Sequence, residues 1–316
     1  MSGENLGITE ITRARERLAH HVRRTPLIHA VPLLQAVPAA RLTLKLESLQ
    51  VTGSFKARGA THKMLTLAPD EARRGLVTAS GGNHGLGVAY AGHLAGAPVT
   101  IYLPANVPPA KAEKLERWGA RLVWHGEVWD DADAAARQAA VRSGATYVHA
   151  FADPAVIAGQ GTIGLEIAED DPDADLLLVA IGGGGLISGV ATAVKALRPE
   201  MRIVGIEPAG APTLHDSLRA GRVVELERIT TAANTLAPRS SAPINFEIIR
   251  RTVDEIVLVE DEEMRAAARW LWFEMGIAAE LSGAAAVAAL LAGRVTAAGR
   301  NVCALICGAG TDGLPA

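Results

Sequence analysis

From residue 42 onward, short apolar runs alternate with stretches of helical spacing, and this alternation limits the chain to few folds. The apolar runs predict strands at residues 42–46, 76–78, 99–103, 121–124, 147–151, 176–181, 203–207 and 302–306. The other stretches predict helices at residues 8–22, 85–95, 109–118, 131–141, 159–169 and 185–197. Alternating strands and helices form mostly parallel sheets that helices cover on both faces.

The length of the chain divides this pattern into two units. A chain of 316 residues is longer than one hydrophobic core usually holds. We therefore predict an α/β fold with two open, mostly parallel twisted sheets and the active site in the cleft between them. The small domain would span residues 72–147, and the large domain would combine residues 1–71 with residues 148–316.

Composition excludes several classes of protein. Apolar residues make up 49% of the chain and charged residues 21%, which is typical of a compact core and not of disorder. The net charge of −3 argues against a nucleic-acid partner. No apolar run reaches the ~20 residues that cross a bilayer, and no signal peptide is evident. With two cysteines and no cluster of metal-ligand spacing, we expect a cytoplasmic protein without a metal site.

Lys56 stands just after the first of these strands, beside Phe55 and before a helix. A lysine at the edge of a buried strand, next to an aromatic ring, can be desolvated enough to keep its amine neutral and nucleophilic. That is the chemistry of a lysine that forms a Schiff base. Taken alone, the stretch is equally typical of a solvated lysine at a helix start.

A run of four glycines follows the predicted strand at residues 176–181 and leads into a helix. Glycines let backbone N–H groups approach an anion closely, and a helix start adds the positive end of its dipole. The run is neither a Walker loop nor a dinucleotide fingerprint. We predict a phosphate-binding loop, against the alternative of a merely tight turn, formed by Gly182, Gly183, Gly184, Gly185 and Leu186.

Two further junctions carry polar groups at strand ends. After the strand at residues 76–78, Ser80 and the backbone of Gly81 and Gly82 could hold a carboxylate, and Asn83 offers a directional amide. The alternative is a helix cap, and His84 taken singly is more often a packed histidine.

Cys307 follows the last predicted strand, at the edge where open α/β sheets bind ligands. Cys303, four residues earlier on the same face, is most simply a core residue. Without the other motifs, Cys307 would also be interpreted as an ordinary buried thiol.

Together, these stretches and the string TGSFKARGA at residues 52–60 resemble the fold type II pyridoxal-phosphate enzymes, the tryptophan synthase β-like superfamily. Within that group the chain is most similar to serine/threonine dehydratases and serine racemase. The resemblance implies a pyridoxal 5′-phosphate cofactor, an amino-acid substrate and a homodimer.

The resemblance also implies roles for individual residues. Lys56 would form the Schiff base and later take the Cα proton. Phe55 would pack against the cofactor ring, Asn83 would bind its phenolic oxygen, and Cys307 would face its nitrogen. The phosphate would lie on Gly182, Gly183, Gly184, Gly185 and Leu186, and the substrate carboxylate on Ser80, Gly81, Gly82, Asn83 and His84.

A thiol partner favours one reaction over others. With a pKa of ~8.5, a cysteine such as Cys307 is mostly neutral at pH 7 and does not hold a protonated ring nitrogen as a carboxylate would. The weaker electron sink favours prompt elimination, so we predict a dehydratase that converts L-threonine, L-serine or a related 3-hydroxy amino acid to a 2-oxo acid and ammonia. The alternatives are a β-replacement enzyme, a racemase and a non-catalytic nucleotide-binding protein.

Several positions depart from the patterns of these relatives. Gly81 stands where racemases have a serine base, and Leu86 where many dehydratases have glutamine, which favours threonine or a bulkier apolar substrate. Thr213 stands where relatives that bind a divalent ion have an acid. Asn234 and Thr235 replace a usual Asp-Gly pair, and the sequence leaves their effect on specificity open.

Overall fold

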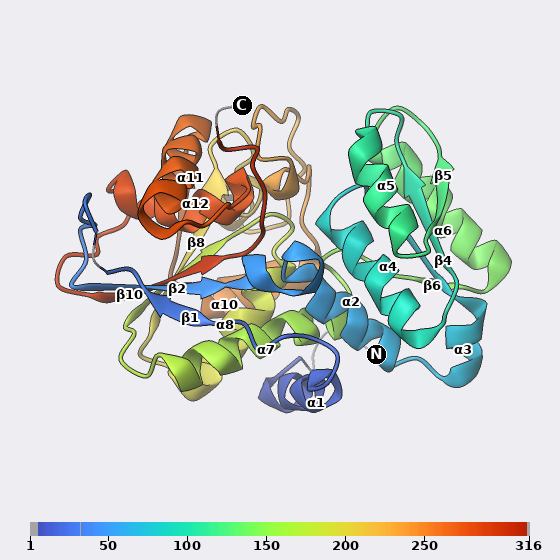
Figure 1. Ribbon diagram of the computed structural model, residues 1–316, viewed down its shortest axis with the longest axis horizontal. Coiled ribbons are helices and arrows are strands. Elements are labelled where there is room, and N and C mark those ends of the chain that lie inside the picture. The colour runs from blue at the N-terminus through green and yellow to red at the C-terminus, as the bar shows by residue number, and fades with distance from the viewer. Residues whose placement is uncertain (1–5, 32, 315–316) are drawn as a thin grey trace.

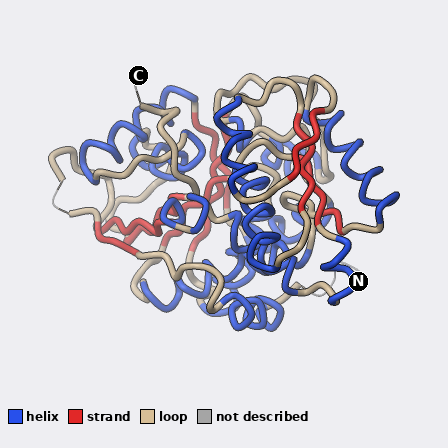
Figure 2. The backbone as a smooth tube through the Cα atoms, turned by 45° about the vertical axis from the view of Figure 1, so that its right-hand side comes forward, coloured by secondary structure: helices blue, strands red, loops and turns tan. Residues whose placement is uncertain are grey.

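The computed structural model describes residues 6–31 and 33–314, which form two sheets with helices on both faces. Figure 1 shows the two sheets side by side, and Figure 2 shows their strands as two separate groups within the surrounding helices. The prediction of an α/β fold with two mostly parallel sheets is confirmed.

The larger sheet has the strand order β1-β2-β10-β7-β8-β9. β1 pairs antiparallel with β2, and every other pair is parallel. All side chains of β7 are buried, as expected for a strand covered on both faces. The strands span Leu27–His29 (β1), Arg41–Leu46 (β2), Leu176–Ala180 (β7), Arg202–Pro208 (β8), Glu255–Val259 (β9) and Asn301–Ile306 (β10).

The smaller sheet has the strand order β5-β4-β3-β6 and is parallel throughout. Its strands span Leu76–Ala79 (β3), Val99–Leu103 (β4), Arg121–Trp124 (β5) and Thr146–Tyr147 (β6). The helices associated with it span Pro69–Arg74 (α3), Asn83–Ala95 (α4), Pro109–Arg117 (α5) and Trp129–Ser143 (α6).

Helices cover the larger sheet from both sides, with α11 and α12 on one face and α7, α8 and α10 on the other (Figure 1). Their bounds are Ile8–Leu18 (α1), Lys56–Leu65 (α2), Pro154–Asp170 (α7), Gly185–Leu197 (α8), Thr213–Ala220 (α9), Pro243–Thr252 (α10), Asp261–Met275 (α11) and Leu281–Leu291 (α12). Short 3₁₀ turns span Glu47–Leu49 (η2), Val51–Gly53 (η3) and Asn234–Leu236 (η4).

Helix α2 connects the two cores. Ala60 and Met64 pack into the core of the smaller sheet. On its other side α2 meets α7 so closely that a Cβ at Gly59 would lie 2.6 Å from the carbonyl oxygen of Val156. The domain boundaries at residues 71 and 147 stay predictions, and α2 is the helix through which the two sheets share contacts.

The structure corrects several predicted elements. The predicted strand at residues 147–151 is wrong, because β6 ends at Tyr147 and the chain turns so that the N–H groups of Phe151 and Ala152 donate to Nδ1 of His149. The predicted helix at residues 8–22 ends at Leu18. Helix α7 begins at Pro154 because the side chain of Asp153 caps it.

Candidate active site

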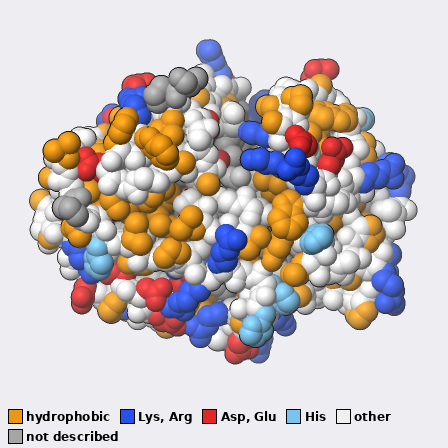
Figure 3. All heavy atoms as spheres, in the orientation of Figure 1, with side chains coloured by type: hydrophobic (Ala, Val, Ile, Leu, Met, Phe, Trp, Pro, Cys, Tyr) orange, Lys and Arg blue, Asp and Glu red, His pale blue; other side chains and the backbone are white. Residues whose placement is uncertain are grey.

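The candidate site lies where the carboxyl ends of β2, β7 and β10 meet turns from the smaller sheet. Figure 3 shows the surface hollowed between the two lobes, with Lys and Arg side chains gathered beside the hollow. In open parallel sheets, ligands bind at this edge because loops from neighbouring strands converge there.

Lys56 is the first residue of α2, and its amine is enclosed by protein although the residue keeps some exposure. Its Nζ donates a hydrogen bond of 2.8 Å to the carbonyl oxygen of Ala150 and lies 5.1 Å from the centre of the Phe55 ring. Burial lowers the pKa of Lys56 to about 8, although Cys307 and Glu280 nearby oppose the shift. A large share of the amine is therefore neutral slightly above neutral pH.

The turn before Lys56 is fastened to the turn that follows β10. The N–H of Phe55 donates to the carbonyl oxygen of Cys307 at 3.2 Å, and the N–H of Ala309 donates to that of Gly53 at 2.8 Å. Within the described residues, Thr52 is the one non-glycine residue with a positive φ, +66°. These contacts bring Lys56 and Cys307 together from opposite ends of the chain.

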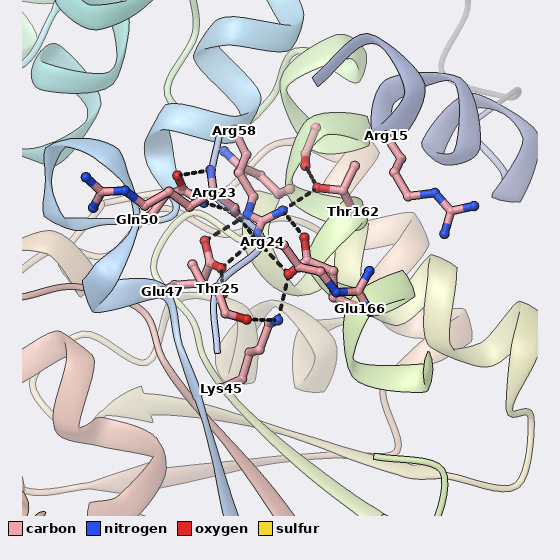
Figure 4. A network of polar contacts seen from close by, with 12 residues as sticks. Arg15, Arg23, Arg24, Thr25, Lys45, Glu47, Gln50, Arg58, Thr162 and Glu166 are labelled. Atoms are coloured by element: carbon pink, nitrogen blue, oxygen red, sulfur yellow. Dashed lines mark hydrogen bonds and ion pairs between the residues drawn. The ribbon is translucent and has the colours of Figure 1, made fainter. Parts of the chain in front are cut away.

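A buried ionic network, shown in Figure 4, anchors the first turn of α2. Arg58, which is 1% exposed, donates from Nη2 to Oε1 of Glu47 at 2.8 Å and from Nη1 to Oε1 of Glu166 at 2.6 Å. Lys45 donates to the second oxygen of Glu166 at 2.6 Å, and Thr25 donates to Glu47. The network ties α2 to β2 and α7 two residues after Lys56, so it fixes the helix that carries the amine.

Cys307 is a buried thiol that faces the same region. Its Sγ donates to the carbonyl oxygen of Ser282 at 3.5 Å. Burial, followed by the charge of Glu280, raises the pKa of Cys307 far above its usual range, so the thiol stays protonated. Cys303 is fully buried in the core of the larger sheet, which confirms its predicted place.

The glycine loop after β7 has little room for side chains. A Cβ at Gly183 would lie 2.3 Å from the ring of Phe151, and one at Gly185 would lie 2.6 Å from the carbonyl oxygen of that residue. Gly184 has a φ of +93° and stands directly before α8, whose N-terminal N–H groups receive no side-chain cap. Backbone N–H groups at an uncapped helix start suit an anion such as phosphate.

The turn after β3 contains the predicted substrate residues. α4 begins at Asn83, and the N–H of Gly82 donates to Oγ of Ser80 at 3.3 Å. A Cβ at Gly81 would lie 2.5 Å from Val107. Crowding therefore favours glycine at position 81, whereas a Cβ at Gly82 would meet no atom within 4 Å.

The side chains of His84 and Asn83 have different hydrogen-bond partners. Nε2 of His84 lies 3.0 Å from both Oγ1 of Thr78 and the carbonyl oxygen of Val148. Burial, together with the charge of Lys56, lowers the pKa of His84 to about 3, so the ring is neutral. Asn83 instead donates from Nδ2 to Oε1 of Glu280 at 2.8 Å.

Three contacts of the candidate site were absent from the sequence prediction. The carbonyl of Ala150 holds the lysine amine, Phe151 lies against the glycine loop, and Glu280 holds Asn83. A backbone carbonyl has no signal in a sequence, and Glu280 lies 197 residues from Asn83. The position of Phe151 at the carboxyl end of the predicted strand at residues 147–151 was the one available signal.

Glu207 is a buried acid close to the Thr213 position. Both of its oxygens accept backbone N–H groups, from Leu214 and His215, each at 2.8 Å, so it caps α9. In the part of the chain that the structure describes, no group of three or more His, Cys, Asp or Glu could hold a metal ion. Among these residues there is also no helix with the length and apolar character of a membrane span.

Comparison with known families places these contacts in context. The sequence model of a family described as "pyridoxal-phosphate dependent enzyme" matches residues 18–308. The chain belongs to this family. The match includes the stretch around Lys56, the glycine loop and Cys307.

Similar proteins have related names. An L-threonine ammonia-lyase of Thermotoga maritima is 41% identical over 305 residues, which cover 96% of this chain and 76% of that protein. Threonine deaminase isoform 2 of Solanum lycopersicum superposes with a TM-score of 0.91 at 33% identity, covering 96% of this chain and 83% of that one. Maize serine racemase gives a TM-score of 0.89 at 32% identity, covering 96% and 93%.

The residues present fit the cofactor of this family. Pyridoxal phosphate needs an amine for its aldehyde and a site for a phosphate dianion. The enclosed amine of Lys56 offers the first, and the glycine loop with the uncapped start of α8 offers the second. Both groups lie beside the same segment, because Ala150 holds the amine and Phe151 lies against Gly183.

Proposed function

We propose that this protein is an ammonia-lyase that converts L-threonine, and L-serine or related 3-hydroxy amino acids, to a 2-oxo acid and ammonia. The observation that carries the proposal is the enclosed amine of Lys56, held beside a neutral thiol in a chain 41% identical to an L-threonine ammonia-lyase. A neutral partner for the cofactor ring favours elimination over reactions that need a long-lived carbanion.

In the proposed site, different residues bind different parts of the cofactor. Lys56 would hold its aldehyde carbon, Phe55 would pack on its ring, Asn83 would bind its ring oxygen and Cys307 would face its nitrogen. The phosphate would lie on the loop of Gly182, Gly183, Gly184, Gly185 and Leu186. When bound, the cofactor links to the substrate amine and withdraws electrons from the bonds at Cα.

The chain's own residues then carry the reaction. The amine of Lys56, once released by the incoming substrate, is neutral enough near pH 8 to take the proton from Cα. Ser80 and the backbone of Gly81 and Gly82 would orient the substrate carboxylate. The β-hydroxyl would leave as water, with a proton that matches the one taken from Cα, and one water taken up later would release ammonia and leave a 2-oxo acid.

Asn83 and His84 are proposed to contribute to substrate binding in different ways. Asn83 is at the start of α4, where its backbone N–H is available to a carboxylate. The His84 ring is engaged with Thr78 and Val148, so its proposed contribution is to pack beneath the loop.

A racemase is the second candidate, because maize serine racemase shares the fold at 32% identity. Racemisation needs a base on the second face of the substrate, and the relatives place a serine at the position of Gly81. Here a Cβ at that position would lie 2.5 Å from Val107, so the site is arranged around glycine. We therefore expect elimination to exceed racemisation.

One assay separates the candidates. Purified protein is incubated with L-threonine, L-serine and D-serine, and 2-oxo acid, ammonia and D-serine are measured. We expect 2-oxo acid and ammonia in equal amounts, most from L-threonine, and little D-serine. A protein that forms D-serine or a thiol adduct faster than 2-oxo acid would contradict the proposal, and so would a Lys56→Ala variant with unchanged activity.

The remaining features follow the family likeness. We propose a cytoplasmic homodimer whose partner in solution is a small amino-acid substrate, without nucleic acid or a membrane. Sedimentation of the purified protein would test the dimer.

A further inference from the structure

Glu280 is a carboxyl in the cleft to which the proposed reaction gives no role. It precedes α12, and its backbone N–H donates to the carbonyl oxygen of Gly308 at 3.3 Å. A Cβ at Gly308 would lie 2.3 Å from Oε1 of Glu280, so the carboxyl lies directly against the turn after Cys307. The same Oε1 accepts the hydrogen bond from Asn83. Glu280 therefore contacts two turns that surround the proposed ring position.

The hydrogen bond to Glu280 fixes the direction of the Asn83 amide. An ionised carboxyl only accepts hydrogen bonds, so Asn83 must turn its NH₂ group, and not its carbonyl, toward Glu280. That NH₂ group carries a second hydrogen, which stays available to another acceptor. The ring oxygen of the cofactor, which Asn83 is proposed to bind, is such an acceptor.

A second donor reaches the same carboxyl oxygen. Oγ1 of Thr235 lies 3.5 Å from Oε1 of Glu280 and is also hydrogen-bonded to Oγ of Ser282. The backbone of Ser282 in turn accepts the thiol of Cys307. Thr235 therefore supplies a hydroxyl to the carboxyl that accepts from Asn83.

Burial and a neighbouring negative charge bring the pKa of Glu280 close to neutral pH. Burial, and then repulsion from Asp312, raise the pKa of Glu280 to about 7, and Asn83, Lys111 and Thr235 oppose the shift. Lys56 and Cys307 are the other titratable groups in electrostatic contact with it, from α2 and from the end of β10. In the described part of the chain, no group donates to its second oxygen, Oε2.

We propose that Glu280 is a positioning residue: it directs one N–H of Asn83 at the cofactor's ring oxygen, and its charge makes that oxygen hold a proton more tightly. The inference rests on the proposed function, since it takes Asn83 to face the ring oxygen. A negative carboxylate near a second acidic group disfavours the loss of a proton there.

The test compares two substitutions in the holoenzyme without substrate. Glu280→Gln removes the charge but keeps an oxygen for Asn83, whereas Glu280→Ala removes both. The visible absorption band of the bound cofactor is titrated from about pH 5.5 to 9.5, and cofactor affinity is measured on the apoprotein. For Glu280→Gln we expect the midpoint to fall by about one pH unit, a tenfold change in proton affinity, with cofactor affinity within about threefold of wild type.

For Glu280→Ala we expect the same fall in midpoint and, in addition, about tenfold weaker cofactor binding, since the amide loses its orienting partner. A matched control is Glu207→Gln, because Glu207 is also a buried carboxyl of raised pKa but caps α9 outside the cleft. It should change thermal stability and leave the midpoint unchanged.

Thr235 provides variants that keep the carboxyl. Thr235→Val should shift the midpoint of the cofactor's visible band by less than Glu280→Gln does. Thr235→Ser should leave that midpoint at the wild-type value, because serine keeps the hydroxyl. The inference is wrong if the wild-type band does not titrate, or if neither Glu280→Gln nor Thr235→Val moves its midpoint by more than about 0.2 units. A wild-type protein without a visible band or 2-oxo acid formation would instead contradict the proposed function.

Discussion

Two groups of buried ionisable side chains meet at the start of α2, one around Arg58 and one that includes Lys56. The protein accommodates the charges of these two groups in opposite ways. In the network around Arg58, opposite charges lie within hydrogen-bonding distance of one another (Figure 4). Although burial alone would lower the pKa of Arg58, Glu47 and Glu166 raise it overall. In the cleft, burial instead shifts Lys56, Cys307 and Glu280 toward their neutral forms.

This difference separates a structural role from a chemical one. A paired charge cannot change its protonation without leaving its partner unpaired, so the network is suited to hold α2 in place. Lys56 and Glu280, with pKa values of about 8 and about 7, can exchange a proton near neutral pH at little cost, whereas the thiol of Cys307 stays protonated. Lys56 and Arg58, which belong to the cleft group and to the network, stand only two residues apart in α2.

The largest expected effect is on the cleft side. Lys56→Ala should lower kcat/KM for L-threonine by at least about 10⁴-fold, because the variant lacks both the covalent link and the base, and it should abolish the visible cofactor band. The control is Lys63→Ala in the same helix, whose partner is Asp153 at 2.7 Å. Activity of that variant within about threefold of wild type is expected, and an equal loss in both variants would contradict the assignment.

The network should show the opposite behaviour, a loss of stability. Arg58→Met leaves the buried Glu47 without its cationic partner and Glu166 with Lys45 alone. It should cost about 3–5 kcal/mol in the free energy of unfolding, measured by denaturant titration. Arg73→Met breaks an exposed pair with Asp70 and should cost less than about 1 kcal/mol. A cost for Arg58→Met as small as that of the control would mean that the network does not anchor α2.

Removing the cleft amine should stabilise the apoprotein at low pH. The pKa of Lys56 is about 8 in the folded chain and near 10.5 when unfolded, so folding favours the neutral amine and is penalised below pH 8. Lys56→Met should therefore be more stable than wild type at pH 7, by about 1 kcal/mol given the exposure that the residue keeps. The gain should shrink as the pH rises from 8 toward 10.5, and a gain that grows with pH would contradict the shifted pKa.

The smallest effect is expected where one neutral group replaces another. Cys307→Ser keeps a protonated donor for the carbonyl of Ser282 and should change kcat/KM by less than about tenfold. Cys307→Asp would place a charge at the same position and serves as the contrasting variant. If Cys307→Ser were as damaging as Cys307→Asp, neutrality would not be the property that matters.

The sequence predicted the parts of the fold that have a strong local pattern. Residues 176–180 form a fully buried strand, and residues 185–197 form the helix expected after the glycines. β1 and β9 escaped prediction because they are short or edge strands with mixed burial. The alanine-rich α12 has no amphipathic period, since nearly all of its side chains are buried.

Within the candidate site, only the residues that stand in a distinctive motif were predictable from the sequence. Lys56 and the glycine loop stand in distinctive local sequences, whereas Glu280 stands in an ordinary one. Its place in the site arises from contacts distant in sequence, since Asn83 from the turn after β3 and Gly308 from the turn after β10 both lie against its carboxyl. Residues 147–151 were predicted to be a strand because their apolar content is high, but the His149 ring accepts the N–H groups that would continue the ladder.

The segment that returns from β6 to α7 has a mechanical consequence. Residues 148–153 are the chain's second covalent connection between the two sheets, and they contain both Ala150, which holds the Lys56 amine, and Phe151, which lies against Gly183. A rotation of the smaller sheet toward the larger one therefore pulls on the partner of the amine and on the glycine loop together. One short stretch of backbone therefore supports both the proposed aldehyde-binding amine and the proposed phosphate loop.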